Sequence, residues 1–514
     1  PRERVWVEVQ NIQFVAACNP PTDPGRIPLS TRFLSHAPVL FVDYPEKQSL
    51  LQIYSTFNRA LLQSKPSVAG MSGPLTQAMV GFYEENKQHF LLEQQPQYVY
   101  SPRELSRWMR ALHSAFTDFK DVHPNDFIRL VAHEGLRLFC DRLVTNEEKT
   151  WCQQTLDRVF TSTFSISDLT VLQRPILFSR WVDGCYQSVD RDSLRKYLES
   201  RLRVFNEEEL NVPLVLFDDV LEHVLRIDRV LRQYLGHLLL VGESGAGKTV
   251  LTRFVAWMNE MQVFQIKVSR RYSLDNFDED LRQVMRMAGV NGQPVCFIFD
   301  ESNILSTGFL ERMNALLANG EVPGLYEGDE MLSLITACRE VALQEGVVLD
   351  SSEELFKWFT IRVQRNLHVV FTMNPANGEF RDRAATSPAL FNRCVVDWFG
   401  SWGRDALLQV SQFFTRSLDL DVPCSLSPQA QSLIAQAWGL KELPASQHVG
   451  MRDSVTAAIL FIHQGVTQFD AEKTGENRCY CSPRDYIDFI NQYVTLFQQK
   501  REELEDQRHH LHVG

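Results

Sequence analysis

Short apolar runs alternate with amphipathic stretches along the second half of the chain. Four runs rich in branched and aromatic residues predict buried strands at His237–Val241, Val295–Phe299, Leu367–Thr372 and Cys394–Phe399. Apolar residues at three-to-four spacing predict packed helices, as at 127–139, 156–164 and 405–418. Strands that alternate with helices are typical of an α/β fold with a parallel sheet.

The first of these strands leads directly into a glycine-rich loop. Its residues read G-E-S-G-A-G-K-T, and an amphipathic helix follows from about Thr249. Glycines let backbone N–H groups surround phosphates, and the helix N-terminus adds its dipole. In this interpretation Lys248 contacts the outer phosphates and the Thr249 hydroxyl binds Mg²⁺. A ligand-free glycine turn is the alternative, and the flanking strand and helix favour the phosphate loop. The predicted nucleotide-binding residues are Gly242, Glu243, Ser244, Gly245, Ala246, Gly247, Lys248 and Thr249.

An acidic pair, Asp300 and Glu301, ends the second predicted strand. An acid at the carboxyl end of a strand near the phosphate loop can hold Mg²⁺ through water, and its neighbour can accept the proton of an attacking water. The alternative is that both acids only begin a helix from Asn303 onward, where acids suit the helix dipole.

Three further polar residues are candidates for the same chemistry. Asn374 follows the third strand and can orient water, although Asn-Pro is also ordinary turn chemistry. Arg393 is either a salt-bridged surface residue or a finger offered to the phosphate of a neighbouring subunit. Arg484 lies in a capping box formed by Ser482 and Asp485, against the positive end of the helix dipole. A cation is disfavoured there, so we predict that Arg484 reaches the γ-phosphate from a lid.

Three of these motifs occur a second time, in the same order, earlier in the chain. Residues 14–20, 28–33 and 100–108 parallel the segments around Asn374, Arg393 and Arg484, and the strand Val39–Asp43 follows Arg32 as another strand follows Arg393. The separations, roughly 350 to 380 positions, far exceed the period of solenoid repeats. The sequence therefore predicts tandem modules, each an α/β nucleotide domain with a helical lid, of which only one carries its phosphate loop here.

Composition narrows the class of protein. With 514 residues, 44% hydrophobic and 23% charged, the chain is expected to form several globular domains. The net charge of -12 argues against a nucleic-acid groove, and the ten scattered cysteines suggest neither zinc nor a disulfide framework. We expect no membrane insertion, because no apolar run approaches the length of a membrane span. The start at Pro1 without methionine and the stop at Gly514 within a predicted helix suggest an excerpt of a longer chain.

Taken together, these motifs are similar to those of the AAA+ ATPases and, in detail, of the motor ring of the dynein heavy chain family, cytoplasmic type. The segments that carry the resemblance are 14–21, 28–33, 253–258, 277–281, 308–326 and 382–394. It extends over essentially the whole chain and implies an AAA+ P-loop NTPase fold: a parallel sheet flanked by helices, all-α lid subdomains, and tandem modules of a ring. It divides the chain into residues 1–45, the C-terminal part of the large subdomain of the third module; 46–166, its helical lid and connecting helices; 167–400, the large nucleotide-binding subdomain of the fourth module; 401–500, its lid; and 501–514, the start of the coiled-coil stalk.

The resemblance also implies roles for single residues. Asp300 becomes the metal-side acid, Glu301 the general base and Asn374 the water-orienting sensor of the fourth module, with Arg484 as its lid sensor. For the third module, Asn19 and Arg103 are the two sensors and Arg393 is the finger supplied in trans, while Arg32 would serve the second. Leu214 and Val215 border the adenine, with ordinary core packing as the alternative.

The implied activity is binding of Mg²⁺ and ATP or ADP, with hydrolysis that drives or regulates minus-end-directed movement on microtubules. One alternative is an ATP-stabilised regulatory scaffold with little turnover; another is a different AAA+ ring remodeller. The implied partners are neighbouring modules, the microtubule through the stalk, and, through a tail outside this chain, dynactin and the intermediate, light intermediate and light chains. The implied location is the cytoplasm, on the microtubule cytoskeleton. Without a finger from a fifth module, we expect this stretch alone to hydrolyse ATP weakly.

Overall fold

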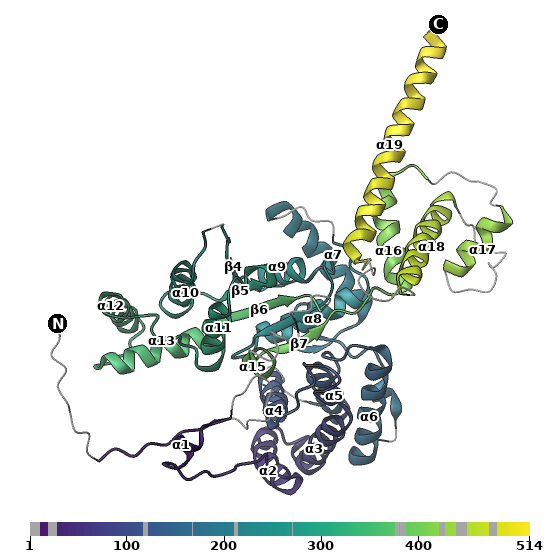
Figure 1. The fold of residues 1–514 in the computed structure, drawn as a ribbon. Helices are drawn as coiled ribbons and strands as arrows, with labels where there is room; N and C mark the ends of the chain where they lie inside the picture. Colours follow the sequence, from purple (N-terminus) through teal and green to yellow (C-terminus); the bar gives the residue numbers. More distant parts are fainter. Residues whose placement is uncertain are drawn as a thin grey trace.

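The computed structural model describes residues 11–18, 28–116, 122–166, 168–209, 214–269, 271–375, 380, 387–420, 427–437, 450–471 and 481–513 (Figure 1). A central sheet with helices on both faces lies between two groups of helices, and one long helix projects away from the body.

The sheet is parallel, with the order β4-β5-β6-β3-β7. Its strands are β3 (Leu238–Val241), β4 (Gln262–Gln265), β5 (Val295–Asp300), β6 (Leu367–Met373) and β7 (Val395–Trp398). Four of them confirm the predicted strands to within one residue at each end. The order puts β3 beside β6 and β7, so the turn after β3 opens at the carboxyl edge of the sheet, where ligands of parallel sheets bind.

Alternate residues of each central strand serve two separate cores. Leu238 and Leu240 of β3 join the core on one face, whereas Leu239 and Val241 join the core on the other. Both faces are buried, which is why these strands are continuous apolar runs. The first face is covered by α7 (Arg191–Glu208), α8 (Asp218–Leu231) and α9 (Lys248–Met258); the second by α10 (Leu274–Gly289), α11 (Thr307–Asn319), α12 (Asp329–Gln344) and α13 (Ser352–Asn366).

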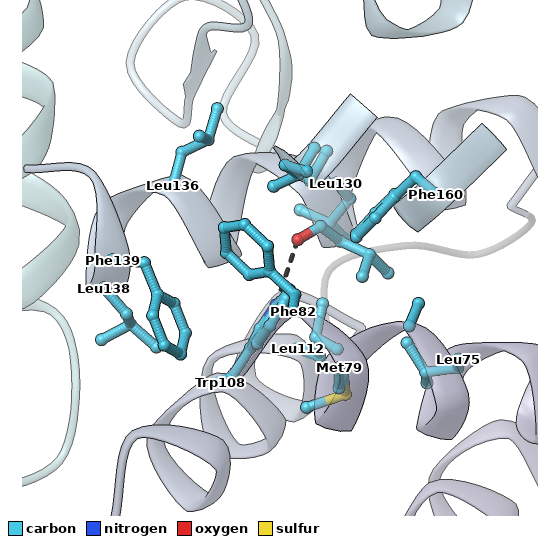
Figure 2. Packing of buried hydrophobic residues seen from close by; sticks show 14 of the residues in the cluster. Leu75, Met79, Phe82, Trp108, Leu112, Leu130, Leu136, Leu138, Phe139 and Phe160 are labelled. Atoms are coloured by element: carbon cyan, nitrogen blue, oxygen red, sulfur yellow. Dashed lines mark hydrogen bonds between the residues drawn. The ribbon is translucent and has the colours of Figure 1, made fainter. Parts of the chain in front are cut away.

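A first helical unit precedes the sheet in the sequence. It consists of α2 (Lys47–Gln63), α3 (Ser72–His89), α4 (Pro102–Phe116), α5 (Pro124–Phe139) and α6 (Asn146–Phe164). Its core surrounds Trp108, which packs against Phe82, Phe139 and Phe160 (Figure 2). The Trp108 indole N–H donates to the Val131 carbonyl at 3.0 Å, so the buried ring leaves no polar group unsatisfied.

A second helical unit follows the sheet. It consists of α16 (Arg404–Phe414), α17 (Pro428–Ala437), α18 (Met451–Ala471) and α19 (Pro483–Val513). The predicted capping box is confirmed, because Ser482 N–H donates to the Asp485 carboxylate at 2.8 Å and Asp485 N–H donates to the Ser482 hydroxyl at 3.4 Å. The charged stretch 498–508 continues α19 without a break, and this helix projects from the body (Figure 1).

The strand predicted at Val39–Asp43 is not formed. Val39, Leu40, Phe41 and Val42 are 70–87% exposed and belong to no ladder. A strand needs a hydrogen-bonded neighbour and a core to cover it, and this segment lies against neither among the described residues.

The remaining elements are short: α1 (Thr31–Leu34), α15 (Pro388–Arg393), the paired strands β1 (Phe178–Ser179) and β2 (Gln187–Ser188), and 3₁₀ turns at Ala69–Met71, Leu169–Leu172, Glu301–Asn303 and Thr415–Ser417. Within the described ranges, every helix is too short or too polar to cross a lipid bilayer.

Candidate phosphate-binding site

The glycine-rich loop turns directly from β3 into α9. Gly245 and Gly247 have φ of 82° and 91°, a region that residues with a Cβ seldom adopt. Because Gly247 is the N-cap of α9, no side chain caps the first turn of this helix. The N–H groups of that turn therefore face the loop without a built-in acceptor, as an anion-binding helix end requires.

Lys248 folds back over the loop. Its Nζ donates to the carbonyl oxygens of Gly242 and Glu243, both at 2.7 Å. Burial lowers the pKa of Lys248 to about 8, and the charges of Asp300, Glu301 and Glu243 only partly offset this effect. The ammonium group is therefore held inside the loop, where it can exchange carbonyl partners for phosphate oxygens.

Asp300 lies at the end of β5 and is held by hydroxyl groups. Its carboxylate accepts from the Thr372 hydroxyl at 2.6 Å and from the N–H and hydroxyl of Ser302 at 3.0 and 2.9 Å. Burial alone would raise the pKa of Asp300, but the hydrogen bonds from Thr372 and Ser302 and the charge of Lys248 lower it. Asp300 also caps the 3₁₀ turn Glu301–Asn303. The helix-starting role considered as the alternative is therefore present together with the position of Asp300 near Lys248.

Glu301 and Asn374 connect the ends of two neighbouring strands. The Asn374 backbone N–H donates to Glu301 Oε2 at 2.8 Å. Since β5 and β6 are paired in parallel register, the predicted base and the predicted water-orienting residue lie side by side at the same edge as the loop.

Sequence reasoning missed Thr372. It directly precedes Met373 and Asn374 and lies opposite Asp300 in the β5–β6 register. The sequence signal for this residue is a hydroxyl side chain two positions before Asn374. This signal is weak, because β-branched threonine is common in strands for its shape alone.

Arg484 approaches the loop through its backbone rather than its guanidinium. A Cβ on Gly245 would lie 2.6 Å from Arg484 Cβ and 2.7 Å from its backbone nitrogen. The Arg484 side chain is 70% exposed, with Nε 3.9 Å from Asp488. The first turn of α19 therefore touches the tip of the loop, while the predicted contact of the guanidinium with a phosphate stays a prediction.

Arg393 belongs to a separate basic cluster. It ends α15, and burial lowers its pKa, as do the neighbouring charges of Arg103 and Arg110 on α4. The structure thus brings Arg103 and Arg393 together, away from the loop. Arg32 lies in α1 and is exposed, and Asn19 lies outside the described residues.

Leu214 and Val215 line a cavity of about 550 Å³ between α7 and α16. Each of the described loop residues 242–249 lies outside its lining. The lining therefore does not connect the two residues with the loop, and both the adenine contact and the core-packing alternative stay open.

A magnesium ion fits this set of residues only together with phosphate. The described residues contain no group of three or more His, Cys, Asp or Glu arranged to hold a metal. Thr249 and Asp300 supply one hydroxyl and one carboxylate, and Mg²⁺ at nucleotide sites takes its other ligands from phosphate oxygens and water.

Comparisons with known proteins agree with this geometry. Residues 212–496 match the model of the P-loop containing dynein motor region D4, and residues 57–149 match that of the dynein heavy chain ATPase lid domain. The cytoplasmic dynein heavy chain of Drosophila melanogaster is 52% identical over 515 residues, covering 100% of this chain and 11% of that protein.

Other relatives agree to a similar degree. The cytoplasmic dynein heavy chain of Dictyostelium discoideum is 51% identical, again over 100% of this chain and 11% of its own length. A dynein heavy chain-like protein 1 of Plasmodium falciparum is 47% identical over 99% of this chain and 10% of its own length. The chain therefore spans about a tenth of the length of the curated relatives it matches.

Proposed function

The chain belongs to the dynein heavy chain family and carries part of an AAA+ motor region, and from this premise we propose that residues 242–249 bind Mg²⁺ and ATP or ADP. One observation carries the proposal: Lys248, Asp300 and Glu301 meet at the carboxyl edge of one parallel sheet, beside an uncapped helix N-terminus.

Each residue has a distinct part in this proposal. The loop N–H groups and Lys248 bind the phosphates, while Thr249 and Asp300 hold the magnesium ion, which supplies charge neutralisation when bound. Glu301 accepts a proton from water, Asn374 holds that water in line, and Arg484 is the lid cation. Leu214 and Val215 would border the base, as the resemblance to the family implies.

A second nucleotide site is proposed at the basic cluster of Arg103, Arg110 and Arg393. Burial and the positive charges of Arg103 and Arg110 lower the pKa of Arg393, and an anion at this cluster would offset the repulsion. Arg103 as sensor and Arg393 as finger would serve the preceding module there, with Asn19 as its other sensor.

We further propose that the whole protein is a microtubule motor ATPase of the cytoplasm whose modules form a ring. Its minus-end-directed movement, its stalk and its contacts with dynactin and the smaller dynein chains belong to this proposal. The domain division at residues 45, 166, 400 and 500 belongs to it as well, although the last boundary falls inside the continuous helix α19.

A regulatory site that binds nucleotide with little turnover is the alternative. It is favoured by the hydrogen bond from Asn374 N–H to Glu301 Oε2, which occupies one oxygen of the proposed base. The two functions differ in rate, not in affinity.

Site-resolved nucleotide binding tests the proposal. Hydrogen exchange of residues 238–258 in the intact protein is expected to slow with Mg²⁺ and ATP, and Lys248→Ala should abolish this protection. Unchanged protection in Lys248→Ala would refute the site. Single-turnover hydrolysis with Glu301→Gln as the only change then separates the two alternatives: a slowed turnover supports catalysis, and an unchanged one supports the regulatory role.

A further inference from the structure

The first residue of the phosphate loop packs against Phe399, whose ring is stacked on another ring. A Cβ on Gly242 would lie 2.6 Å from Phe399 Cβ, and Phe399 N–H donates to the Val241 carbonyl at 2.8 Å. The Phe399 ring is stacked on the imidazole of His223, with centroids 3.8 Å apart and an interplanar angle of 9°. The position of Gly242 is therefore fixed by Phe399, and that of Phe399 by His223 on α8.

An ion network continues from His223 to the first helical unit. His223 Nδ1 lies 2.7 Å from Asp397 Oδ2, and Arg226 Nη1 donates to Asp397 Oδ1 at 3.1 Å. Arg226 Nε in turn lies 3.3 Å from Asp141 Oδ1, just beyond the end of α5. Trp398 N–H donates to the Asp141 carbonyl at 2.8 Å, so β7 and the helical unit are joined through backbone as well.

The network is buried, and its two carboxylates differ: burial raises the pKa of Asp141 despite the charges of Arg137 and Arg226. The side chains of Asp397 and Asp141 are 2% and 3% exposed. Burial alone would raise the pKa of Asp397, but His223 and Arg226 lower it to about 2. Buried ion pairs tolerate little displacement, because separating the partners leaves a charge without compensation. A shift of Asp141 therefore moves Arg226 and Asp397 with it.

We propose that Asp141, Arg226, Asp397, His223 and Phe399 are positioning residues that make nucleotide affinity at the phosphate loop depend on how the first helical unit is docked. The inference rests on the proposed nucleotide binding and adds a route for coupling between modules. By linkage, nucleotide at the loop strengthens docking of the helical unit by the same factor.

The same interface contains a matched control pair. Glu134 on α5 lies 2.9 Å from Arg229 Nε on α8, and its side chain is 2% exposed. Among the described residues, the hydrogen bonds and ring contacts of this pair reach Ala111 and Tyr186, not β7. Glu134→Gln therefore weakens the interface with the same chemistry as Asp141→Asn but without a connection to Gly242.

Nucleotide titration followed by hydrogen exchange of residues 238–258 in the intact protein tests the proposal. We expect Asp141→Asn to raise the ADP concentration that gives half-maximal protection by roughly 5-fold or more, within the usual range of coupling between sites. Glu134→Gln should leave this concentration within about twofold of that of the unmodified protein. Arg226→Lys keeps the positive charge but loses the guanidinium group that contacts both Asp397 and Asp141, so it should raise this concentration as well. Thermal unfolding of each variant verifies the fold.

Equal shifts in Asp141→Asn and Glu134→Gln, or no shift in Asp141→Asn and Arg226→Lys, would overturn the coupling while leaving nucleotide binding intact. If the unmodified protein shows no protection by ADP, the proposed function fails and the inference fails with it. If Asp141→Asn does not fold, the Arg226→Lys titration decides.

Discussion

At the residue scale, we expect the protonation of Lys248 to affect nucleotide binding. Its pKa of about 8 means that the ammonium form begins to be lost just above neutral pH. Phosphates carry negative charge there, so they stabilise the ammonium form and raise this pKa on binding. Nucleotide binding then takes up a proton above pH 8.

We therefore expect the Kd for ADP to increase as pH rises from about 8 to 10, approaching tenfold per pH unit. Isothermal titration at three pH values measures it. Lys248→Arg, whose charge persists throughout, serves as the control and should lose this dependence if it binds. A Kd that is constant across the range in the unmodified protein would contradict the assignment.

The lowered pKa of Lys248 also affects the ligand-free fold. Because the folded-state pKa is below the ordinary lysine value, the unfolded chain binds more protons between these two values. Lys248 therefore lowers the free energy of unfolding below pH 8, and this penalty disappears as pH rises toward the ordinary value. Such a cost is typical of a charge kept for binding.

Thr372 is expected to support the carboxylate of Asp300. Thr372→Val removes the 2.6 Å hydrogen bond, raises the pKa of Asp300 and should lower the free energy of unfolding by about 1.5–3 kcal/mol. Urea unfolding at pH 7 measures the loss. Thr336→Val, which removes an exposed hydroxyl bonded within α12, should cost far less; equal losses would show that Asp300 is not involved.

Much of the candidate site at the carboxyl edge of the sheet could be predicted from residue spacing. The remaining contacts depend on how the strands pair. Lys248, Asp300 and Asn374 follow strands, and a parallel sheet brings such ends together. The hydroxyl of Thr372 could not be assigned from sequence, because its partner is fixed by pairing across β5 and β6. The contact of the Arg484 guanidinium with a phosphate stays a prediction; in this structure its Nε lies 3.9 Å from Asp488.

At the element scale, the contact between the loop and α19 depends on a missing side chain. Gly245→Ala would add a Cβ at positive φ and drive it into the backbone of Arg484. We expect a loss of about 1–2 kcal/mol from the conformation alone, and displacement of the first turn of α19. Hydrogen exchange of residues 483–490 measures the displacement as faster exchange.

Gly346→Ala is the matched control, because Gly346 also has positive φ, 77°, and a Cβ there meets open space. It should leave exchange at the start of α19 unchanged. If Gly245→Ala left it unchanged as well, the loop and the helix would not be in contact in solution.

Sequence reasoning missed one strand and predicted another that is not formed, for two different physical reasons. The edge strand β4 reads Gln-Val-Phe-Gln and has both outer residues polar, so it lacks the apolar run that marked its neighbours. The expected strand at 39–43 has that run but lies beside no partner strand among the described residues. A hydrophobic pattern indicates which residues are buried. It does not show whether a partner strand is present, and a strand needs one.

At the scale of the whole molecule, the three cores are linked through the loop. The loop contacts Phe399, just after β7, and the first turn of α19. Through Phe399 and the residues of α8 it is linked to the first helical unit. A ligand that fixes the loop should therefore stabilise both helical units and not only the sheet.

We expect ADP at a hundred times its Kd to raise the free energy of unfolding by about 2.7 kcal/mol. Thermal unfolding with and without ADP measures the gain as a higher Tm, and hydrogen exchange of α5 and α19 shows whether it extends to both units. Lys248→Ala should remove the gain. A gain of equal size in that variant would mean that ADP acts elsewhere.

The uninterrupted course of α19 has a mechanical consequence. Its 31 residues extend for about 46 Å, and its first turn contacts Gly245. A tilt of about 10° at that pivot would swing the far end by about 8 Å. Because the first turn of α19 contacts Gly245, we expect that a small displacement of the loop would move the far end of this helix several times as far.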